Sequence, residues 1–166
     1  MSTVVSNVTL RPMRWPDIEA VHAIETAVFD VDPWSAEQFW GELAQPTRHY
    51  VVAESEGSII GYAGAYLLPP DADVQTIAVS PNAQGKGAGR LLLEQLISIV
   101  SDRGCSQLLL EVRSDNSSAI GMYERFGFES ISKRRDYYAR GVDALIMRLR
   151  PLQSAGARKD EGQGES

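Results

Sequence analysis

The spacing of hydrophobic residues along positions 8–150 predicts an α/β domain. Short runs of apolar or alternating residues predict seven strands, at 8–11, 49–54, 59–67, 74–79, 108–112, 129–135 and 144–150. Apolar residues three or four positions apart predict four helices, near 17–28, 35–43, 88–104 and 117–126. The sheet should be parallel around the strand–helix–strand crossover at 74–112 and antiparallel elsewhere.

Polar residues and glycines mark where these helices begin and end. Asp17 stands before the first apolar helix position and is expected to cap that helix. Ser35 and Gln38 have the spacing of a capping box, which predicts the start of the second helix. Gly104 and Gly127 follow the third and fourth helical stretches and are expected to end them.

Composition narrows the class of protein. The 166 residues are 43% hydrophobic and 23% charged, a globular balance that excludes a wholly disordered, collagen-like or coiled-coil chain. A net charge of −6 argues against non-specific binding of nucleic acid, which ordinarily needs a basic surface. One cysteine, Cys105, excludes an internal disulfide and a thiolate metal cluster, and two distant histidines give no zinc pair. Cys105 itself is expected to pack in the interior.

The two ends of the chain differ from its body. Residues 1–7 are expected to be flexible, and residues 151–166, rich in glycine, serine, glutamine and charge, are expected to form a disordered tail. The first ten residues have no basic segment followed by an apolar run, so no signal peptide is expected. No run of about 18 apolar residues occurs either, and we expect a soluble cytoplasmic protein without a membrane partner.

A glycine-rich turn gives the strongest local signal for binding. Its residues are Gln84, Gly85, Lys86, Gly87, Ala88, Gly89 and Arg90. Alternating glycines uncover the backbone amides of a helix start, which can bind phosphate with help from Lys86 and Arg90. Ser80 and Gly87 break the pattern of the nucleoside-triphosphatase loop, and Arg90 breaks the dinucleotide-binding fingerprint. The alternative is a flexible connection whose glycines serve tight packing.

Glu111 is a candidate general base. It follows three consecutive leucines, whose lack of alternation predicts a strand that is covered on both faces. It also stands near the carboxyl end of a parallel strand, where open α/β sheets bind their ligands. Burial would raise the pKa of this carboxyl toward neutrality, as a general base requires. The alternative is a solvated edge position or an ion pair with Arg113.

Five other residues have both a structural and a functional interpretation. Tyr123 lies on the apolar face of its helix, and the pattern favours a core tyrosine with a hydrogen-bonded hydroxyl. Asn116 either caps that helix or contacts a ligand. Trp34 and the pair Tyr137–Tyr138 fall in predicted loops, where aromatic residues line a substrate groove or pack onto the body of the protein.

The glycine-rich turn and the order of elements resemble the GNAT superfamily of N-acetyltransferases. The turn is similar to that superfamily's signature of arginine or glutamine, two residues, glycine, one residue, and glycine or alanine. The likeness is closer to the RimI type, the ribosomal-protein alanine N-acetyltransferases, and it covers about residues 8–150. The segments that carry it are Pro33-Trp34-Ser35, Ile77-Ala78-Val79, Leu110-Glu111-Val112-Arg113, Asn116, Ala119-Ile120, Tyr123-Glu124, Gly127-Phe128 and Arg134-Arg135-Asp136-Tyr137-Tyr138.

The resemblance implies a single GNAT domain with a mixed, mostly antiparallel sheet that splays at its central parallel strands and carries helices on both faces. It implies acetyl-CoA as donor and no metal. The cofactor's pyrophosphate would bind the segment 84–90, its pantetheine arm would pair with the backbone of 77–79, and Asn116 would contact it. Glu111 would be the general base and Tyr123 the general acid facing sulfur. Because a tyrosine pKa of ~10 exceeds a thiol pKa of ~8.5, Tyr123 is expected mainly to donate a hydrogen bond.

The implied reaction acetylates the α-amine of a protein N-terminus, by analogy the alanine end of a small-subunit ribosomal protein. Trp34, Tyr137 and Tyr138 would line the groove for this peptide. Deprotonating an α-amine at pH 7 costs only about 1 kcal/mol, whereas a lysine amine costs roughly 4–5 kcal/mol, so a single carboxylate suits the first task better. The alternatives are acetylation of lysines or small-molecule amines, and a non-catalytic acetyl-CoA-binding subunit. The presence of both Glu111 and Tyr123 disfavours the last.

Overall fold

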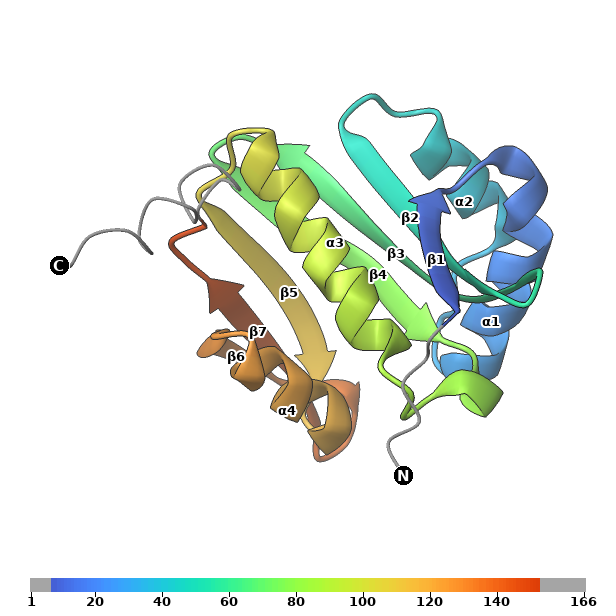
Figure 1. The fold of residues 1–166 in the computed structure, drawn as a ribbon. Coiled ribbons are helices and arrows are strands. Elements are labelled where there is room, and N and C mark those ends of the chain that lie inside the picture. The colour runs from blue at the N-terminus through green and yellow to red at the C-terminus, as the bar shows by residue number, and fades with distance from the viewer. Residues whose placement is uncertain (1–6, 153–166) are drawn as a thin grey trace, which may run out of the picture. The chain divides into compact units, whose positions relative to one another are not determined.

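The computed structural model of this chain describes residues 7–152 (Figure 1). Its strands are β1 (Val8–Pro12), β2 (Arg48–Ser55), β3 (Ser58–Leu68), β4 (Asp71–Val79), β5 (Gln107–Arg113), β6 (Glu129–Ala139) and β7 (Val142–Leu149). Its α-helices are α1 (Ile18–Val28), α2 (Ala36–Leu43), α3 (Ala88–Asp102) and α4 (Ser117–Arg125), with 3-10 turns at Trp15–Asp17 and Pro81–Ala83. The predicted order of elements is confirmed. The ends predicted to be flexible lie outside the described residues, apart from positions 7, 151 and 152.

The strands belong to two compact units. The first unit comprises residues 7–66 and 75–96, and the second comprises 67–74 and 97–152. Hydrogen-bonded neighbours follow the order β1-β2-β3-β4-β5-β7-β6, with β4 continuing from the second unit into the first. β4 and β5 run parallel, with Asp71–Asp73 in register with Gln107–Leu109. The pairs β1–β2, β2–β3, β5–β7 and β6–β7 are antiparallel, so the predicted mixed sheet is confirmed.

In the first unit, helices cover both faces of the strands (Figure 1). Tyr62 of β3 is fully buried among side chains that α1 and α2 contribute, including Val21 and Phe39. The preceding residue, Gly61, faces the other way, and a Cβ there would stand 3.0 Å from the Leu92 side chain of α3. Because successive residues of a strand point to opposite faces, α3 lies across the strands from α1 and α2. The capping box at Ser35 forms as predicted, and Phe39 of that helix is buried.

In the second unit, α4 follows β5 and ends where predicted. Phe126 closes the helix and Gly127 adopts a φ of +100°, in the left-handed region that glycine enters readily. β7 pairs with β5, and its side chains Ala144 and Met147 are buried. β6 is an exposed edge strand. Within residues 7–152, the helices are all too short or too polar to cross a lipid bilayer.

The last hairpin departs from the prediction. The segment 136–143, predicted to be a loop, is mostly strand, and only Arg140 and Gly141 separate β6 from β7. Asp136 takes a φ of +53° where the register of the two strands shifts. Its Oδ1 accepts the N–H of Gly141 at 2.6 Å, and its own N–H donates to Asp143 at 3.0 Å. These bonds let a bulge replace the loop, so Tyr137 and Tyr138 lie in a strand and their predicted loop position is wrong.

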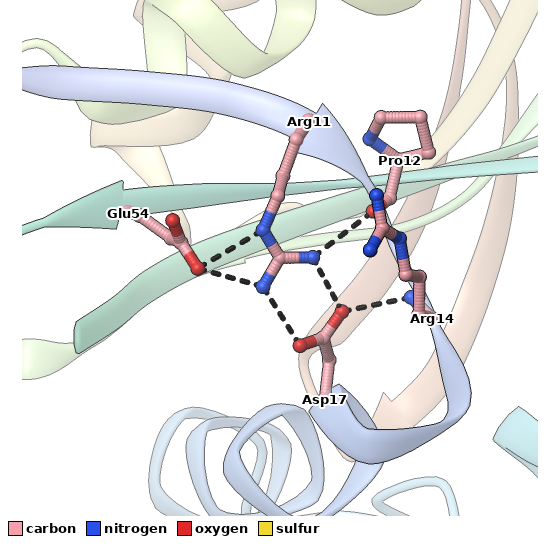
Figure 2. A network of polar contacts seen from close by, with 5 residues as sticks. All are labelled: Arg11, Pro12, Arg14, Asp17 and Glu54. Atoms are coloured by element: carbon pink, nitrogen blue, oxygen red, sulfur yellow. Dashed lines mark hydrogen bonds and ion pairs between the residues drawn. The ribbon is translucent and has the colours of Figure 1, made fainter. Parts of the chain in front are cut away.

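Asp17 has a different role from the predicted one. It precedes α1, but its side chain makes no capping bond to that helix. Instead its two carboxylate oxygens accept both terminal nitrogens of Arg11, at 2.7 and 2.8 Å (Figure 2). Arg11 also reaches Glu54 of β2 at 2.6 Å, and the N–H of Arg14 donates to Asp17 at 2.7 Å. The network thus joins β1, β2 and the turn before α1, and the predicted cap is wrong because a nearby guanidinium binds the carboxylate more strongly than a helix amide does.

Replacing Asp17 by asparagine should lower the free energy of unfolding by about 1–3 kcal/mol at pH 7, because Arg11 loses a charged two-point partner. The hydrogen bonds from Arg11 hold the pKa of Asp17 below its ordinary value. A lowered pKa stabilises the fold above the ordinary value of ~3.9, and this stabilisation is lost as the pH falls through the folded-state pKa. Urea unfolding at pH 7 and at a series of acidic pH values measures both the loss of stability and its dependence on pH.

The difference between Asp17→Asn and the unmodified protein should therefore shrink as the medium is acidified below a pH of about 4. Asp115→Asn is the matched control, since that exposed carboxylate also pairs with an arginine, Arg113, at 3.0 Å. It should change stability much less, because solvent screens the pair. Equal effects of the two substitutions would show that the Asp17 network has no special weight in the fold.

Candidate active site

The glycine-rich turn lies in the first unit, between β4 and α3. Gly85 and Gly87 have φ values of +79° and +90°, in the left-handed region that is costly for residues with a side chain. A Cβ at either position would meet no atom within 4 Å. Conformation therefore requires glycine at these two positions, and the alternative that they serve tight packing is wrong.

The turn presents backbone donors at the start of α3. Leu91 donates to the carbonyl of Gly87 at 3.1 Å, so the amides before Leu91 precede the hydrogen-bonded turns of the helix. Gln84 ties the turn to the end of β4, because its side-chain amide donates to the carbonyl of Val79 at 3.0 Å. Arg90 is exposed and pairs with Glu94 at 3.2 Å. An open backbone cradle with exposed cations is suited to an anion the size of a phosphate group.

Glu111 lies on the solvent-facing side of β5. Leu108, Leu110 and Val112 are buried, but the residues between them alternate to the other face, and a third of the Glu111 side chain is exposed. The prediction of a strand covered on both faces is therefore wrong, and the desolvation argument for Glu111 fails with it. Burial alternates along β5 even through the three consecutive leucines, because Leu109 between its two buried neighbours is only half-buried. The side chain is solvated, as the alternative held, although β5 lies between β4 and β7 and not at an edge. Arg134 forms an ion pair with Glu111 at 4.0 Å.

Glu111 belongs to a cluster of charged and aromatic side chains in the second unit. We call Glu111, Arg113, Arg134, Tyr137 and Tyr138 the Glu111 cluster. The guanidinium of Arg113 stands 5.3 Å from the ring of Tyr138, and that of Arg134 stands 5.6 Å from the ring of Tyr137. The two tyrosine rings meet edge to face at 5.1 Å. Burial, followed by the negative charge of Glu111, raises the pKa of Tyr138. The structure thus brings the predicted base and two predicted substrate-binding residues together.

Tyr123 is buried on α4, with 5% of its surface exposed. Its ring packs against Phe128, with 5.7 Å between the ring centres. Burial raises its pKa to about 12. A phenol of this kind keeps its proton through the physiological range, so Tyr123 can donate a hydrogen bond but is a poor proton source.

The other candidate residues have defined structural roles. Asn116 caps α4, because its side-chain oxygen accepts the N–H of Ala119 at 3.2 Å. Trp34 lies between α1 and α2 and packs its ring against Phe39, 5.3 Å away. Ile77, Ala78 and Val79 form the end of β4. Cys105 is buried as predicted, and burial raises the pKa of its thiol.

Two features of these units were not predicted. Glu25 is a buried carboxylate of α1 that is hydrogen-bonded to three segments of the first unit. The signal for it was a charged residue in the helical stripe that contains Val21 and Val28. Arg134 lies in one of the segments that carry the family resemblance, but no role was predicted for it. Its place beside Glu111 depends on strand pairing that one sequence does not reveal. Among residues 7–152, metal-binding side chains form no group of three that could hold an ion.

Comparison with known proteins finds relatives over most of the chain. The profile of the acetyltransferase (GNAT) family matches residues 15–128. N-alpha-acetyltransferase RimI of Mycobacterium tuberculosis is 40% identical over 154 residues, which cover 89% of this chain and 96% of that protein. Ribosomal protein bS18-alanine N-acetyltransferase of Escherichia coli is 33% identical over 144 residues, covering 85% of this chain and 96% of that protein. The crystal structure of the ribosomal-protein-S18-alanine N-acetyltransferase from Escherichia coli has a TM-score of 0.80 at 34% identity, covering 90% and 96%.

These matches confirm the predicted resemblance and the predicted fold, a single GNAT domain with a mixed seven-stranded sheet. The glycine cradle fits the phosphate groups of the family's acetyl donor, since Gly85 and Gly87 leave room for a ligand where a Cβ would stand. The protein is thus an N-acetyltransferase that uses acetyl-CoA. The chain belongs to the GNAT family of acetyltransferases and, within that family, to the RimI type.

Proposed function

We propose that this enzyme acetylates the α-amine of a protein N-terminus, and that its substrate is the N-terminal alanine of a small-subunit ribosomal protein. One observation carries the proposal, namely the likeness to relatives named for N-alpha-acetylation and for ribosomal protein bS18-alanine acetylation, over 89% and 85% of this chain. Such a substrate is synthesised in the cytoplasm, where we expect the enzyme to act. We assign the catalytic domain to residues 8–150.

The proposed contacts to acetyl-CoA come mainly from the first unit. The backbone amides of 84–90, with Lys86 and Arg90, are assigned to the pyrophosphate, which the positive φ values of Gly85 and Gly87 support. The backbone of 77–79 is assigned to the pantetheine arm. Asn116 of the second unit is assigned a further contact, since its cap uses only the side-chain oxygen and its NH2 group is a donor.

The proposed chemistry gives each reacting group one task. Acetyl-CoA, when bound, supplies a thioester whose carbonyl carbon the amine attacks. Glu111 accepts the proton that the ammonium group loses, and its exposure allows a water molecule to carry that proton. The backbone N–H near Val79 donates a hydrogen bond to the acyl oxygen. Tyr123 donates a hydrogen bond to the sulfur, whose bond to the acyl carbon breaks so that the thiolate of CoA leaves. The raised pKa of Tyr123 keeps its phenol protonated for this task.

An N-terminal amine suits this set of residues. Its pKa of ~7.7–8.0 leaves roughly a tenth of it as free amine at pH 7, so one carboxylate suffices as a base. Trp34, Tyr137 and Tyr138 are the proposed contacts to the peptide. The assignment of the two tyrosines is supported by their place in the Glu111 cluster, close to the proposed base for the peptide's amine.

Replacing Gly87 by alanine should weaken acetyl-CoA binding about tenfold, since a side chain at positive φ costs about 1–2 kcal/mol and shifts the turn. Gly104→Ala is the matched control, because Gly104 has the same φ of +90° and the same open surroundings at the other end of α3. Both variants should lose similar stability. Isothermal titration with acetyl-CoA should show weaker binding only for Gly87→Ala, and equal affinity in both variants would remove the turn from the cofactor assignment.

A panel of amine substrates tests the proposed function. The purified enzyme is given acetyl-CoA and peptides that differ only in their first residue, together with a peptide that has a blocked N-terminus and an internal lysine, and with polyamines. We expect acetyl transfer to the α-amine of the alanine peptide, located by tandem mass spectrometry. Indifference to the first residue, a preference for lysine or polyamine, or no transfer at all would contradict the proposal.

A further inference from the structure

Glu25 is a carboxylate in the interior of the first unit. It lies on α1 with only 3% of its surface exposed, in the helix face that also carries Val21 and Val28. An ionised carboxylate removed from water costs several kcal/mol unless hydrogen bonds compensate for the lost hydration. Its partners therefore indicate which parts of the fold it holds.

Three donors from three segments bind this carboxylate. The hydroxyls of Tyr62 on β3 and Thr76 on β4 donate to Oε1 at 2.5 and 3.2 Å. The other oxygen, Oε2, accepts the backbone N–H of Trp34 at 3.2 Å. Glu25 thus links the strands to the segment between α1 and α2, and each of its oxygens has a separate task.

The segment that contains Trp34 connects a sharp turn to the start of α2. Asp32, two residues earlier, adopts a φ of +47°, so the chain turns sharply just before Trp34. Ser35, the next residue, begins α2 through its capping box. The bond from Trp34 to Glu25 fixes the backbone between these two points, and the Trp34 ring then rests against Phe39.

We infer that Glu25 is a positioning residue for peptide binding, because it holds the Trp34 segment in the conformation that receives the substrate. This inference rests on the proposed function, in which Trp34 contacts the peptide. In this proposal Glu25 contacts neither acetyl-CoA nor the peptide, because it is buried beneath the segment. Its effect on the reaction passes through the backbone of Trp34.

Glu25→Gln separates the two tasks of the side chain. An amide has one oxygen, and we expect it to stay with the two hydroxyl donors, Tyr62 and Thr76. The NH2 group then faces the N–H of Trp34, donor against donor, and that bond is lost. Thr76→Val is the matched control, since it removes a donor to Oε1 with little change of volume and leaves the bond to Trp34 in place.

The kinetic arm of the test uses the alanine peptide. Glu25→Gln should raise the KM for peptide about tenfold and leave kcat and the Kd for acetyl-CoA within about twofold. Thr76→Val should leave the KM for peptide within about twofold. A parallel fall in acetyl-CoA affinity, or an equal rise of the peptide KM in both variants, would overturn the inference, because it would indicate a general loss of structure.

A second arm does not depend on any substrate. In the background Trp15→Phe/Trp40→Phe, Trp34 is the remaining tryptophan, and acrylamide quenching of its fluorescence reports how firmly its segment is held. Glu25→Gln should increase quenching, and Thr76→Val should not. Unchanged quenching in Glu25→Gln would overturn the inference even if the peptide is acetylated as proposed. Increased quenching without acetylation of any N-terminal peptide would support the positioning of Trp34 and refute the proposed function instead.

Discussion

Replacing Glu111 by glutamine should lower kcat for the alanine peptide at least ~100-fold, the usual contribution of a positioned general base. Glutamine keeps the shape of the side chain but cannot accept the proton of the ammonium group. Affinity for acetyl-CoA should not change, because Glu111 lies in the cluster with Arg134 and Tyr138 rather than in the glycine-rich turn. Steady-state kinetics and titration with acetyl-CoA measure the two quantities separately.

The pH dependence of the Glu111→Gln deficit identifies the task of the carboxylate. Above a pH of about 8 most of the α-amine is already free, so a base is needed less and the deficit should shrink. Glu129→Gln is the control, as a second exposed glutamate of the same unit. A kcat within about threefold of the unmodified enzyme would remove Glu111 from the role of base. A deficit that stays constant with pH would assign it to binding the ammonium group instead.

Features set by neighbouring residues in the sequence were predicted well. The capping box at Ser35 and the turns at Gly85 and Gly87 depend on local backbone conformation, and the structure has them where the residue types indicate. Asp17 shows where this reasoning fails. Its spacing is that of a cap, but Arg11 binds the carboxylate across a short gap, and propensity alone does not reveal such a competing partner.

The candidate site was predicted in its residue types more than in its environment. The strand that contains Glu111 was predicted to be covered on both faces because the leucines before Glu111 show no alternation. The prediction failed because Leu109 is apolar but only half-buried. Arg134 reaches Glu111 from β6, which lies next to β7 and not to β5 in the strand order. Glu25 was missed because a charge in an apolar stripe gives no sign of three donors that are distant in the sequence.

Tyr123 is buried whereas Glu111 is exposed, and the burial of Tyr123 is compatible with its proposed role. With a pKa of about 12 against a thiol near 8.5, full transfer of its proton to sulfur would be uphill by roughly 5 kcal/mol. The contribution proposed for Tyr123 is therefore a hydrogen bond to the sulfur as negative charge develops there. A hydrogen bond to a charged acceptor in a dry environment is worth about 1.5–3 kcal/mol.

Tyr123→Phe should accordingly lower kcat by ~10²-fold while the ring, its packing on Phe128 and the fold remain. The loss should be the same at every pH between about 6 and 10, since a group with a pKa of about 12 does not titrate there. Tyr50→Phe is the matched control, another buried tyrosine with 5% of its surface exposed. A loss below about threefold for Tyr123→Phe would make Tyr123 a core residue only. A loss that grows as the pH falls would show that it delivers a proton after all, and that the sulfur leaves as a thiol.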